Sequence, residues 1–287
     1  MDSCRPRGHD ANRSPTSGPA AAVPLSLGSV VTEQWFLGDA PLFRVPPYHL
    51  VHGAERLAYA ALDVIGGTVS IVFVKAVGAL RPRLRAWPPW TWYLQPVAAG
   101  LLIGAIALRF PQVMGAGYEY IDQAMHDQYG WRALLALCLL KAPTTTASFV
   151  SGTPGGLFAP TLFIGAMLGG AVCAIERLFA PGLTGPIGGY ALVGMGTTFA
   201  GILRAPMTSV FMIIEVSGNH SIILPVMISN TIAYLLSRQF QPHAQFDLLS
   251  RQDGTLLPSM EEEREERIRT IVVKSPVDAS AGGTPDR

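Results

Sequence analysis

The sequence predicts an all-α integral membrane protein, built as a bundle of tilted and broken helices. Of its 287 residues, 49% are hydrophobic and only 14% are charged, whereas about 25% of the residues in an ordinary soluble domain are charged. Most of the charge lies in residues 1–14 and 238–287, so the middle of the chain is more apolar still. The 30 glycines and 23 prolines are too many for smooth spanning helices and favour interrupted ones.

Composition and charge also argue against several other classes of protein. The net charge of +1 gives no indication of a nucleic-acid partner. The three cysteines, Cys4, Cys138 and Cys173, have no metal-like spacing and indicate no disulfide framework. The six histidines form no ligand pair in an apolar helix, which argues against an intramembrane enzyme. We therefore expect no enzymatic activity and no cofactor.

The first half of the chain contains a leader and three predicted helices. Residues 1–27 are polar and rich in Pro and Ser, so we expect a disordered leader, and no signal peptide is recognisable. The pair Gly66-Gly67 predicts close packing within the first long helix. The three arginines of residues 81–85 are expected in a cytoplasmic loop, followed by an aromatic belt. The helices are predicted over residues 55–80, 94–110 and 119–126.

The second half contains apolar segments of unequal length. The helix predicted over residues 207–216 has only about ten apolar residues, whereas some 20 are needed to cross a bilayer. We therefore expect this helix to cross only part of the bilayer or to tilt steeply. Residues 260–269 are expected to form a solvated helix in a cytoplasmic tail, 255–287. The other helices are predicted over residues 131–146, 158–179, 190–201, 222–236 and 246–250. Such unequal, broken helices are typical of a transporter or channel core.

The most informative break is the stretch Ser151–Pro160. Its glycines and proline end one helix, and another begins near Phe158. Non-helical backbone at membrane depth is tolerated only where it is buried in protein or faces water. The new helix presents unpaired N–H groups and the positive end of its dipole to that space. These properties predict a small anion-binding site inside the membrane.

Five segments, in the same order, resemble those of one protein family. Residues 155–160 resemble the GxFxP signature of the CLC family of chloride channels and chloride/proton antiporters. Four other segments resemble family segments as well: residues 111–118, 141–145, 194–196 and 204–215. The resemblance extends over residues 37–254, and the first 25 residues resemble nothing in the family. It implies a CLC-type fold of two inverted repeats, of which this chain corresponds to the second, and a homodimer in the complete protein.

The resemblance also implies an ion site. Leu157 and Phe158 would donate backbone N–H groups to chloride, while Gly155 and Gly156 would let the backbone approach it closely. Phe246 aligns with the family's central tyrosine but has no hydroxyl to donate. The family motifs GSGIP and GREGP, which supply a chloride-coordinating serine and the gating glutamate, occur nowhere in this sequence.

Three charged residues in apolar surroundings each allow two interpretations. Glu215 is either a functional intramembrane carboxylate or a structural residue, and the structural role is favoured. Lys141 either attracts anions from a vestibule or extends its ammonium group to the membrane interface. Arg204 is expected to bind carbonyls that end the preceding helix rather than to serve transport. The resemblance further implies that residues 202–216 and 222–236 form subunit contacts, although an apolar surface facing lipid would have the same composition.

The implied function is transmembrane chloride transport by a multi-pass protein of the cell membrane. Its expected partners are the chloride ion and the lipid bilayer, and its C-terminus is expected in the cytoplasm. The membrane domain is placed at residues 28–254, and the CBS domains of many relatives are absent. Channel or antiporter, and chloride or fluoride, remain open alternatives. A further alternative is a non-conducting fragment, or an assembly partner, that needs the missing N-terminal half.

Overall fold

A computed structural model describes residues 55–252, except 154, 180–183, 219–221 and 242–243, together with a few positions between 28 and 43. The chain divides into two units, residues 1–42 and 43–287. The predicted leader and the predicted helix at 260–269 lie outside the described residues.

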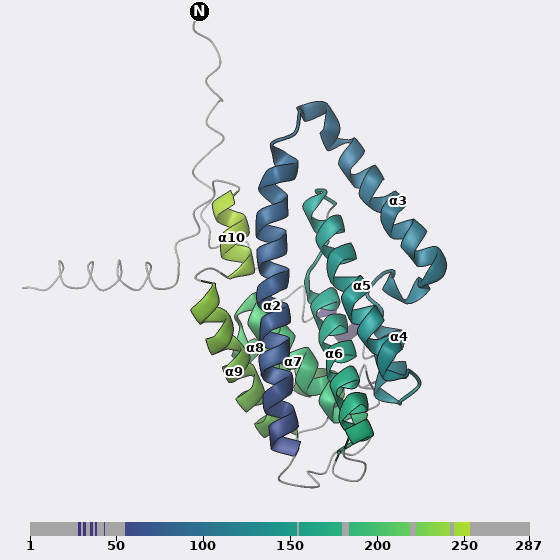
Figure 1. The fold of residues 1–287 in the computed structure, drawn as a ribbon, viewed down its shortest axis with the longest axis vertical. Coiled ribbons are helices and arrows are strands. Elements are labelled where there is room, and N and C mark those ends of the chain that lie inside the picture. Colours follow the sequence, from purple (N-terminus) through teal and green to yellow (C-terminus); the bar gives the residue numbers. More distant parts are fainter. Residues whose placement is uncertain are drawn as a thin grey trace, which may run out of the picture. The chain divides into compact units, whose positions relative to one another are not determined.

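Every regular element described in the second unit is helical, which confirms the predicted all-α class (Figure 1). The α-helices of that unit are α2 (Glu55–Arg85), α3 (Leu94–Arg109), α4 (Tyr118–Met125), α5 (Trp131–Val150), α6 (Phe158–Phe179), α7 (Ile187–Leu203), α8 (Pro206–Ser217), α9 (Ile223–Phe240) and α10 (Gln245–Gln252). Two short 3₁₀ helices, η1 (Pro89–Trp92) and η2 (Pro111–Val113), stand before and after α3.

Within the part of the chain that the structure describes, four helical segments are long and apolar enough to cross a membrane: Ala58–Arg85, Trp90–Arg109, Trp131–Val150 and Phe158–Phe179. Helices α7 and α8 are apolar but shorter. The 12 residues of α8 extend about 18 Å at 1.5 Å per residue, well short of a hydrocarbon core about 30 Å thick. The chain therefore combines full-length and partial membrane helices.

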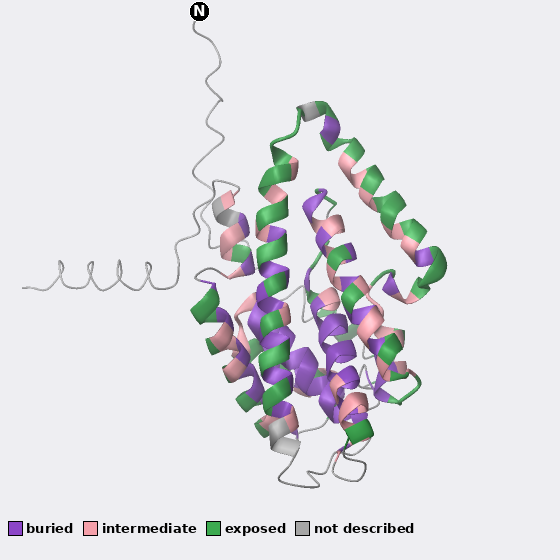
Figure 2. Ribbon diagram, viewed as in Figure 1, coloured by how far each residue is buried: buried purple, intermediate pink, exposed green. Residues whose placement is uncertain are grey.

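Helices α6 and α7 form the centre of the core, and their residues are mostly buried (Figure 2). Three glycines let the two backbones touch. A Cβ atom added at Gly169 would lie 2.0 Å from the carbonyl oxygen of Tyr190, and one added at Gly194 would lie 2.3 Å from that of Gly165. Because the obstacles are backbone atoms, no side-chain rotation relieves the clash.

The predicted packing role of Gly66-Gly67 is confirmed. A Cβ atom at Gly66 would lie 2.7 Å from Cγ2 of Thr197 on α7, and one at Gly67 would lie 2.8 Å from Cδ2 of Leu236 on α9. Helix α2 therefore packs closely against both helices at this pair.

The predicted arginine loop is wrong, because α2 continues through Pro82 to Arg85. Proline has no N–H group, so in a helix it leaves the carbonyl four residues earlier without a donor. That carbonyl belongs to Gly78, and Nε2 of Gln252 donates to it at 2.9 Å. Nη1 of Arg81 also donates to the carbonyl of Leu249, at 3.3 Å. Helix α10 thus stabilises the end of α2.

We expect Gln252→Ala to lower the free energy of unfolding by about 1 kcal/mol, the usual contribution of one such hydrogen bond. Thermal unfolding followed by circular dichroism measures this change. Gln239→Ala, at an exposed position of α9, is the matched control and should leave the midpoint unchanged. Equal midpoints for the two variants would show that the Gly78 carbonyl does not need this donor.

Two other helices, α5 and α9, extend further toward the C-terminus than the sequence predicts. Helix α5 runs to Val150 rather than to residue 146, passing through Pro143, and α9 runs to Phe240 rather than to residue 236. Threonine hydroxyls accompany the extension of α5, since Oγ1 of Thr146 donates to the carbonyl of Ala142 at 2.8 Å. Polar residues that suggest a helix end in sequence are accommodated here inside the helix.

Candidate anion site

The helix break lies where the sequence predicts it. Helix α5 ends at Val150, Gly152 adopts a left-handed conformation with φ of +86°, and α6 begins at Phe158. Oγ1 of Thr161 donates to the carbonyl of Phe158 at 2.7 Å. The N–H groups of the first residues of α6 have no acceptor within the helix. They are the donors on which an anion site at this position depends.

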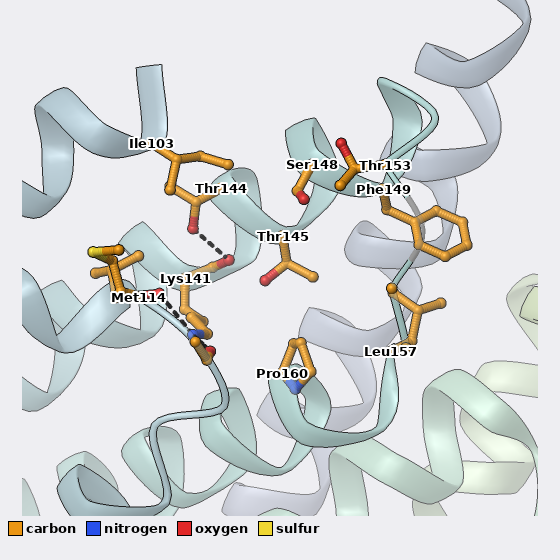
Figure 3. Close-up of a pocket in the computed structure, with 14 residues that line it drawn as sticks. Ile103, Met114, Lys141, Thr144, Thr145, Ser148, Phe149, Thr153, Leu157 and Pro160 are labelled. Atoms are coloured by element: carbon orange, nitrogen blue, oxygen red, sulfur yellow. Dashed lines mark hydrogen bonds between the residues drawn. The ribbon is translucent and has the colours of Figure 1, made fainter. Parts of the chain in front are cut away.

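A pocket of about 340 Å³ opens between this break, helix α5 and the turn before α4 (Figure 3). Of the described residues that line it, Lys141 is the only charged one, and none is acidic. The described lining residues are Ile103, Val113, Met114, Gly115, Lys141, Thr144, Thr145, Ser148, Phe149, Thr153, Gly155, Gly156, Leu157 and Pro160. The pocket therefore has a positive, hydroxyl-bearing wall suited to an anion.

Three of the five predicted site residues, Gly155, Gly156 and Leu157, line this pocket. A Cβ atom at either glycine would meet nothing within 4 Å, so the space over this stretch of backbone is open. Phe158 is not among the lining residues, although it is the first residue of α6. Its ring is 43% exposed and packs edge-on against Phe199, with centroids 5.5 Å apart.

The fifth predicted residue, Phe246, lies elsewhere, on α10, and is not among the described residues that line this pocket. Its side chain is 54% exposed, whereas the preceding Gln245 is fully buried, with neither amide atom hydrogen-bonded. The helical period explains the difference, because Gln245 shares a face with the buried Leu249 and Phe246 does not. The ion-binding role of Phe246 stays a prediction.

Lys141 does not extend to the interface, so that interpretation is wrong. The residue is only 2% exposed, and its Nζ donates to the carbonyls of Val113 and Gly115, each at 2.7 Å. Nζ also lies 4.8 Å from the ring centroid of Phe163. The turn that Lys141 holds is itself constrained, since Gly117 has φ of +75° and a Cβ there would lie 2.5 Å from Phe163. The ammonium group is therefore fixed in the pocket wall.

Hydroxyl residues also line this pocket, and none of them was predicted from the sequence to contact the ion. Thr145 and Ser148 lie three positions apart on α5, hence on one face, and both line the pocket. Figure 3 shows the Thr145 side chain extending from α5 toward the side on which Pro160 lies. The run of threonines in an apolar helix just before the break was the available signal.

Glu215 and Arg204 have no place at this pocket. Glu215 is exposed on α8. Arg204 has a structural role, as expected, but on a different helix: its Nη2 donates to the carbonyls of Ser237 and Gln241 at the end of α9. Among the described residues, no group of three or more His, Cys, Asp or Glu side chains could hold a metal ion.

Curated relatives are similar to most of this chain. The chain is 30% identical over 221 residues to a ClcB-like chloride channel protein of Ralstonia nicotianae. The aligned residues make up 77% of this chain and 51% of the relative. It is 31% identical over 206 residues to the H(+)/Cl(-) exchange transporter ClcA of Salmonella arizonae, covering 71% of this chain and 44% of the relative. The chain thus spans about half the length of these relatives.

Solved structures share the fold. A slow cyanobacterial Cl⁻/H⁺ antiporter matches with a TM-score of 0.72 at 21% identity, over 83% of this chain and 56% of the other. A CLC-type fluoride/proton antiporter matches with a TM-score of 0.63 at 23% identity, over 80% of this chain and 55% of the other.

The family profile described as "Voltage gated chloride channel" matches residues 16–238. The match begins inside the first 25 residues, where no resemblance was expected, and ends before Phe246. It includes the helix break, the Lys141 turn and the pocket between them. This chain belongs to the voltage-gated chloride channel (CLC) family.

Proposed function

We propose that this chain serves transmembrane chloride transport, as part of a CLC-type channel or chloride/proton antiporter, with chloride bound at the start of α6. The observation that carries the proposal is the pocket beside the helix break. Its wall combines backbone at a helix N-terminus with a single cation, Lys141, and no described acidic residue. The printed names of the relatives, a chloride channel and an H(+)/Cl(-) exchanger, support chloride as the anion.

The donors in this wall suit an ion that must also leave. Backbone N–H groups at Leu157 and Phe158 would contribute about half a positive charge together. The hydroxyls of Thr145 and Ser148 would add neutral donors from α5. Lys141 shares its charge with two carbonyls, so its hold on an anion is weaker than that of a free ammonium group. Binding sites that conduct must combine such attraction with easy release.

The proposal also covers the complete assembly. Helices α8 and α9 carry exposed apolar side chains suited to a subunit contact in a homodimer: Met207, Phe211, Leu224, Met227 and Ile228. An apolar face of this kind is typical of obligate interfaces. The C-terminus would then follow α10 into the cytoplasm.

A second candidate function is an assembly partner that conducts chloride only together with the remaining half of the membrane domain. Two observations favour it. The chain spans about half of its curated relatives, and Gly155 and Gly156 face open space. A wall supplied by the other half would complete the coordination of the ion.

Chloride efflux from liposomes tests both candidates. We expect little efflux from the chain alone and clear efflux when it is co-expressed with the N-terminal half of the Ralstonia relative. In that complex, Gly156→Leu should lower efflux about tenfold or more, a barrier increase of about 1.4 kcal/mol or more, because its side chain enters the pocket. The matched control is Gly100→Leu on α3, where a Cβ also meets nothing within 4 Å.

Each outcome decides between the candidates. Robust efflux from the chain alone would contradict the assembly-partner role. Equal efflux for Gly156→Leu and the unchanged complex would contradict an ion pathway at the start of α6.

A further inference from the structure

An aspartate inside a membrane helix has no role in the pocket described above. Asp63 lies on α2, within the apolar segment Ala58–Arg85, and is only 2% exposed. Ionisable residues at such positions are rare and mark functional sites. The residue lies on the side of α2 that packs against α7 and α9, away from the residues that line the anion pocket.

Hydroxyl groups from two other helices meet this carboxyl group. Oγ of Ser229 on α9 is hydrogen-bonded to Oδ1 of Asp63. Oγ1 of Thr197 on α7 lies 3.4 Å from the same oxygen and 2.7 Å from Oγ of Ser229. Thr197 can also donate to the carbonyl of Val193, at 2.8 Å. Both hydroxyl residues are buried, with exposures of 1% and 0%.

No cation accompanies the carboxyl group in the described part of the chain. The ion pairs found there join His126 to Asp122 and Arg177 to Asp127. The described titratable and charged side chains on α2 near Asp63 and on helices α6, α7 and α9 are Tyr59 on α2, Cys173, Glu176 and Arg177 on α6, Tyr190 on α7, and Tyr234 and Arg238 on α9. Of these, Tyr190 stacks on Tyr59 and donates to Glu176 at 2.7 Å.

That set holds two cations, and neither pairs with Asp63: Arg177 is bonded to Asp127, and Arg238 is remote. Arg238 stands nine positions beyond Ser229 on α9, about 13 Å along the helix at 1.5 Å per residue. An ionised carboxylate buried without a partner costs several kcal/mol and neutralises itself instead.

Proton counting shows that the cluster accommodates a neutral acid. With a proton on Asp63, the acid donates to Ser229, Ser229 donates to Thr197, and Thr197 donates to the carbonyl of Val193. Without that proton, the chain reverses, so that Thr197 donates to Ser229 and Ser229 donates to the carboxylate. Ser229 keeps one donated and one accepted bond in both states, and Thr197 always donates one bond, to the carbonyl of Val193 or to Ser229. The same three side chains therefore serve a carboxyl group that gains and loses a proton.

We propose that Asp63, Ser229 and Thr197 form an intramembrane proton-binding site in which Asp63 keeps its proton at pH 6, where ordinary carboxyl groups are ionised. A pocket of about 410 Å³ between α2 and α9 reaches the carboxyl group. Tyr59 and Ala60 line it from α2, and Leu224 and Ile228 line it from α9. This site is independent of the chloride site, so it stands or fails separately from the proposed function.

Infrared difference spectroscopy of the purified chain in lipid nanodiscs tests the proposal. Ordinary carboxyl groups ionise near pH 4, so a protonated-carboxyl band that persists at pH 6 and disappears on alkalinisation reports a retained proton. We expect Asp63→Asn to remove that band. Glu215→Gln, which changes an exposed carboxylate on α8, is the matched control and should leave it unchanged. Absence of the band from the unchanged chain, or its persistence in Asp63→Asn, would overturn the proposal.

Thermal unfolding gives a second readout. Because an amide replaces a neutral acid without changing its shape, Asp63→Asn should keep the midpoint of the unchanged chain. A midpoint that rises in sodium chloride over choline chloride, and only when Asp63 is present, would show a metal cation at the site and overturn the proposal. If Asp63→Asn does not fold, Ser229→Ala decides: the band must shift when its hydroxyl partner is removed, and an unshifted band contradicts the site.

Discussion

Gly169→Ala is expected to prevent the chain from folding normally, although it adds only one methyl group. The new Cβ would lie 2.0 Å from the carbonyl oxygen of Tyr190 and 2.7 Å from its carbonyl carbon. Overpacking a core costs about 1–3 kcal/mol when side chains can yield, and sometimes more. Here the obstacle is backbone in the first turn of α7, so α6 and α7 must separate, and we expect a loss above that range. Size-exclusion chromatography in detergent and the thermal midpoint measure it.

Gly104→Ala on α3 is the matched control for this prediction. A Cβ at Gly104 meets nothing within 4 Å, and alanine in a helix is favoured over glycine by up to about 1 kcal/mol. The control should therefore be as stable as the unchanged chain or slightly more stable. A monodisperse Gly169→Ala protein with an unaltered midpoint would show that α6 and α7 do not touch as described.

The sequence was most informative where local chemistry decides the structure. Glycine and proline within Ser151–Pro160 end α5 and let α6 begin at Phe158, because neither residue needs a distant partner to interrupt a helix. The Gly66-Gly67 pair likewise predicted close packing, since only small residues permit it. Three residues that the family resemblance implied for the ion site, Gly155, Gly156 and Leu157, lie at the same break and line the pocket.

The errors arose where a residue distant in sequence supplies the partner. Pro82 predicts a helix end, but Gln252, 174 positions after Gly78, donates to the carbonyl that the proline leaves free. Asp63 was passed over because its hydroxyl partners come from α7 and α9. Its position in an apolar run was a sufficient signal.

Phe246 was assigned to the ion site by aligning a motif on a short helix. On such a helix, a shift of the alignment by one residue moves the aligned side chain to a different face. Helix α10 turns Gln245 inward and leaves Phe246 largely exposed. The family profile match ends at residue 238 and does not extend to this helix.

Lys141→Met is expected to weaken both the fold and the response to chloride. Methionine matches the length of lysine but donates no hydrogen bond, so the carbonyls of Val113 and Gly115 lose their donor. Each buried group left unsatisfied costs about 1–3 kcal/mol. Burial of the ammonium group is no longer a cost in the variant, which offsets part of the loss. We therefore expect a net destabilisation of about 2 kcal/mol, measured as a lower thermal midpoint in sodium gluconate.

The charge of Lys141 is tested separately, by adding chloride. An anion that binds only the folded protein raises the midpoint in proportion to the logarithm of its concentration above Kd. In the unchanged protein, co-expressed with the N-terminal half, sodium chloride should raise the midpoint above its value in sodium gluconate. Lys141→Met should lose this rise, because the pocket then keeps no charged lining residue among those described.

A control on the same wall separates the two roles of the lysine. Thr145→Val removes a hydroxyl from the pocket but keeps the shape of the side chain and the charge of Lys141. It should leave the midpoint in gluconate unchanged and reduce the chloride-dependent rise only in part. If Lys141→Met keeps the full rise, the ammonium group does not act on the ion and serves only to hold the turn at Val113 and Gly115. If its midpoint in gluconate equals that of the unchanged protein, those two hydrogen bonds do not stabilise the fold, and the pocket wall is positioned by packing around Phe163 instead.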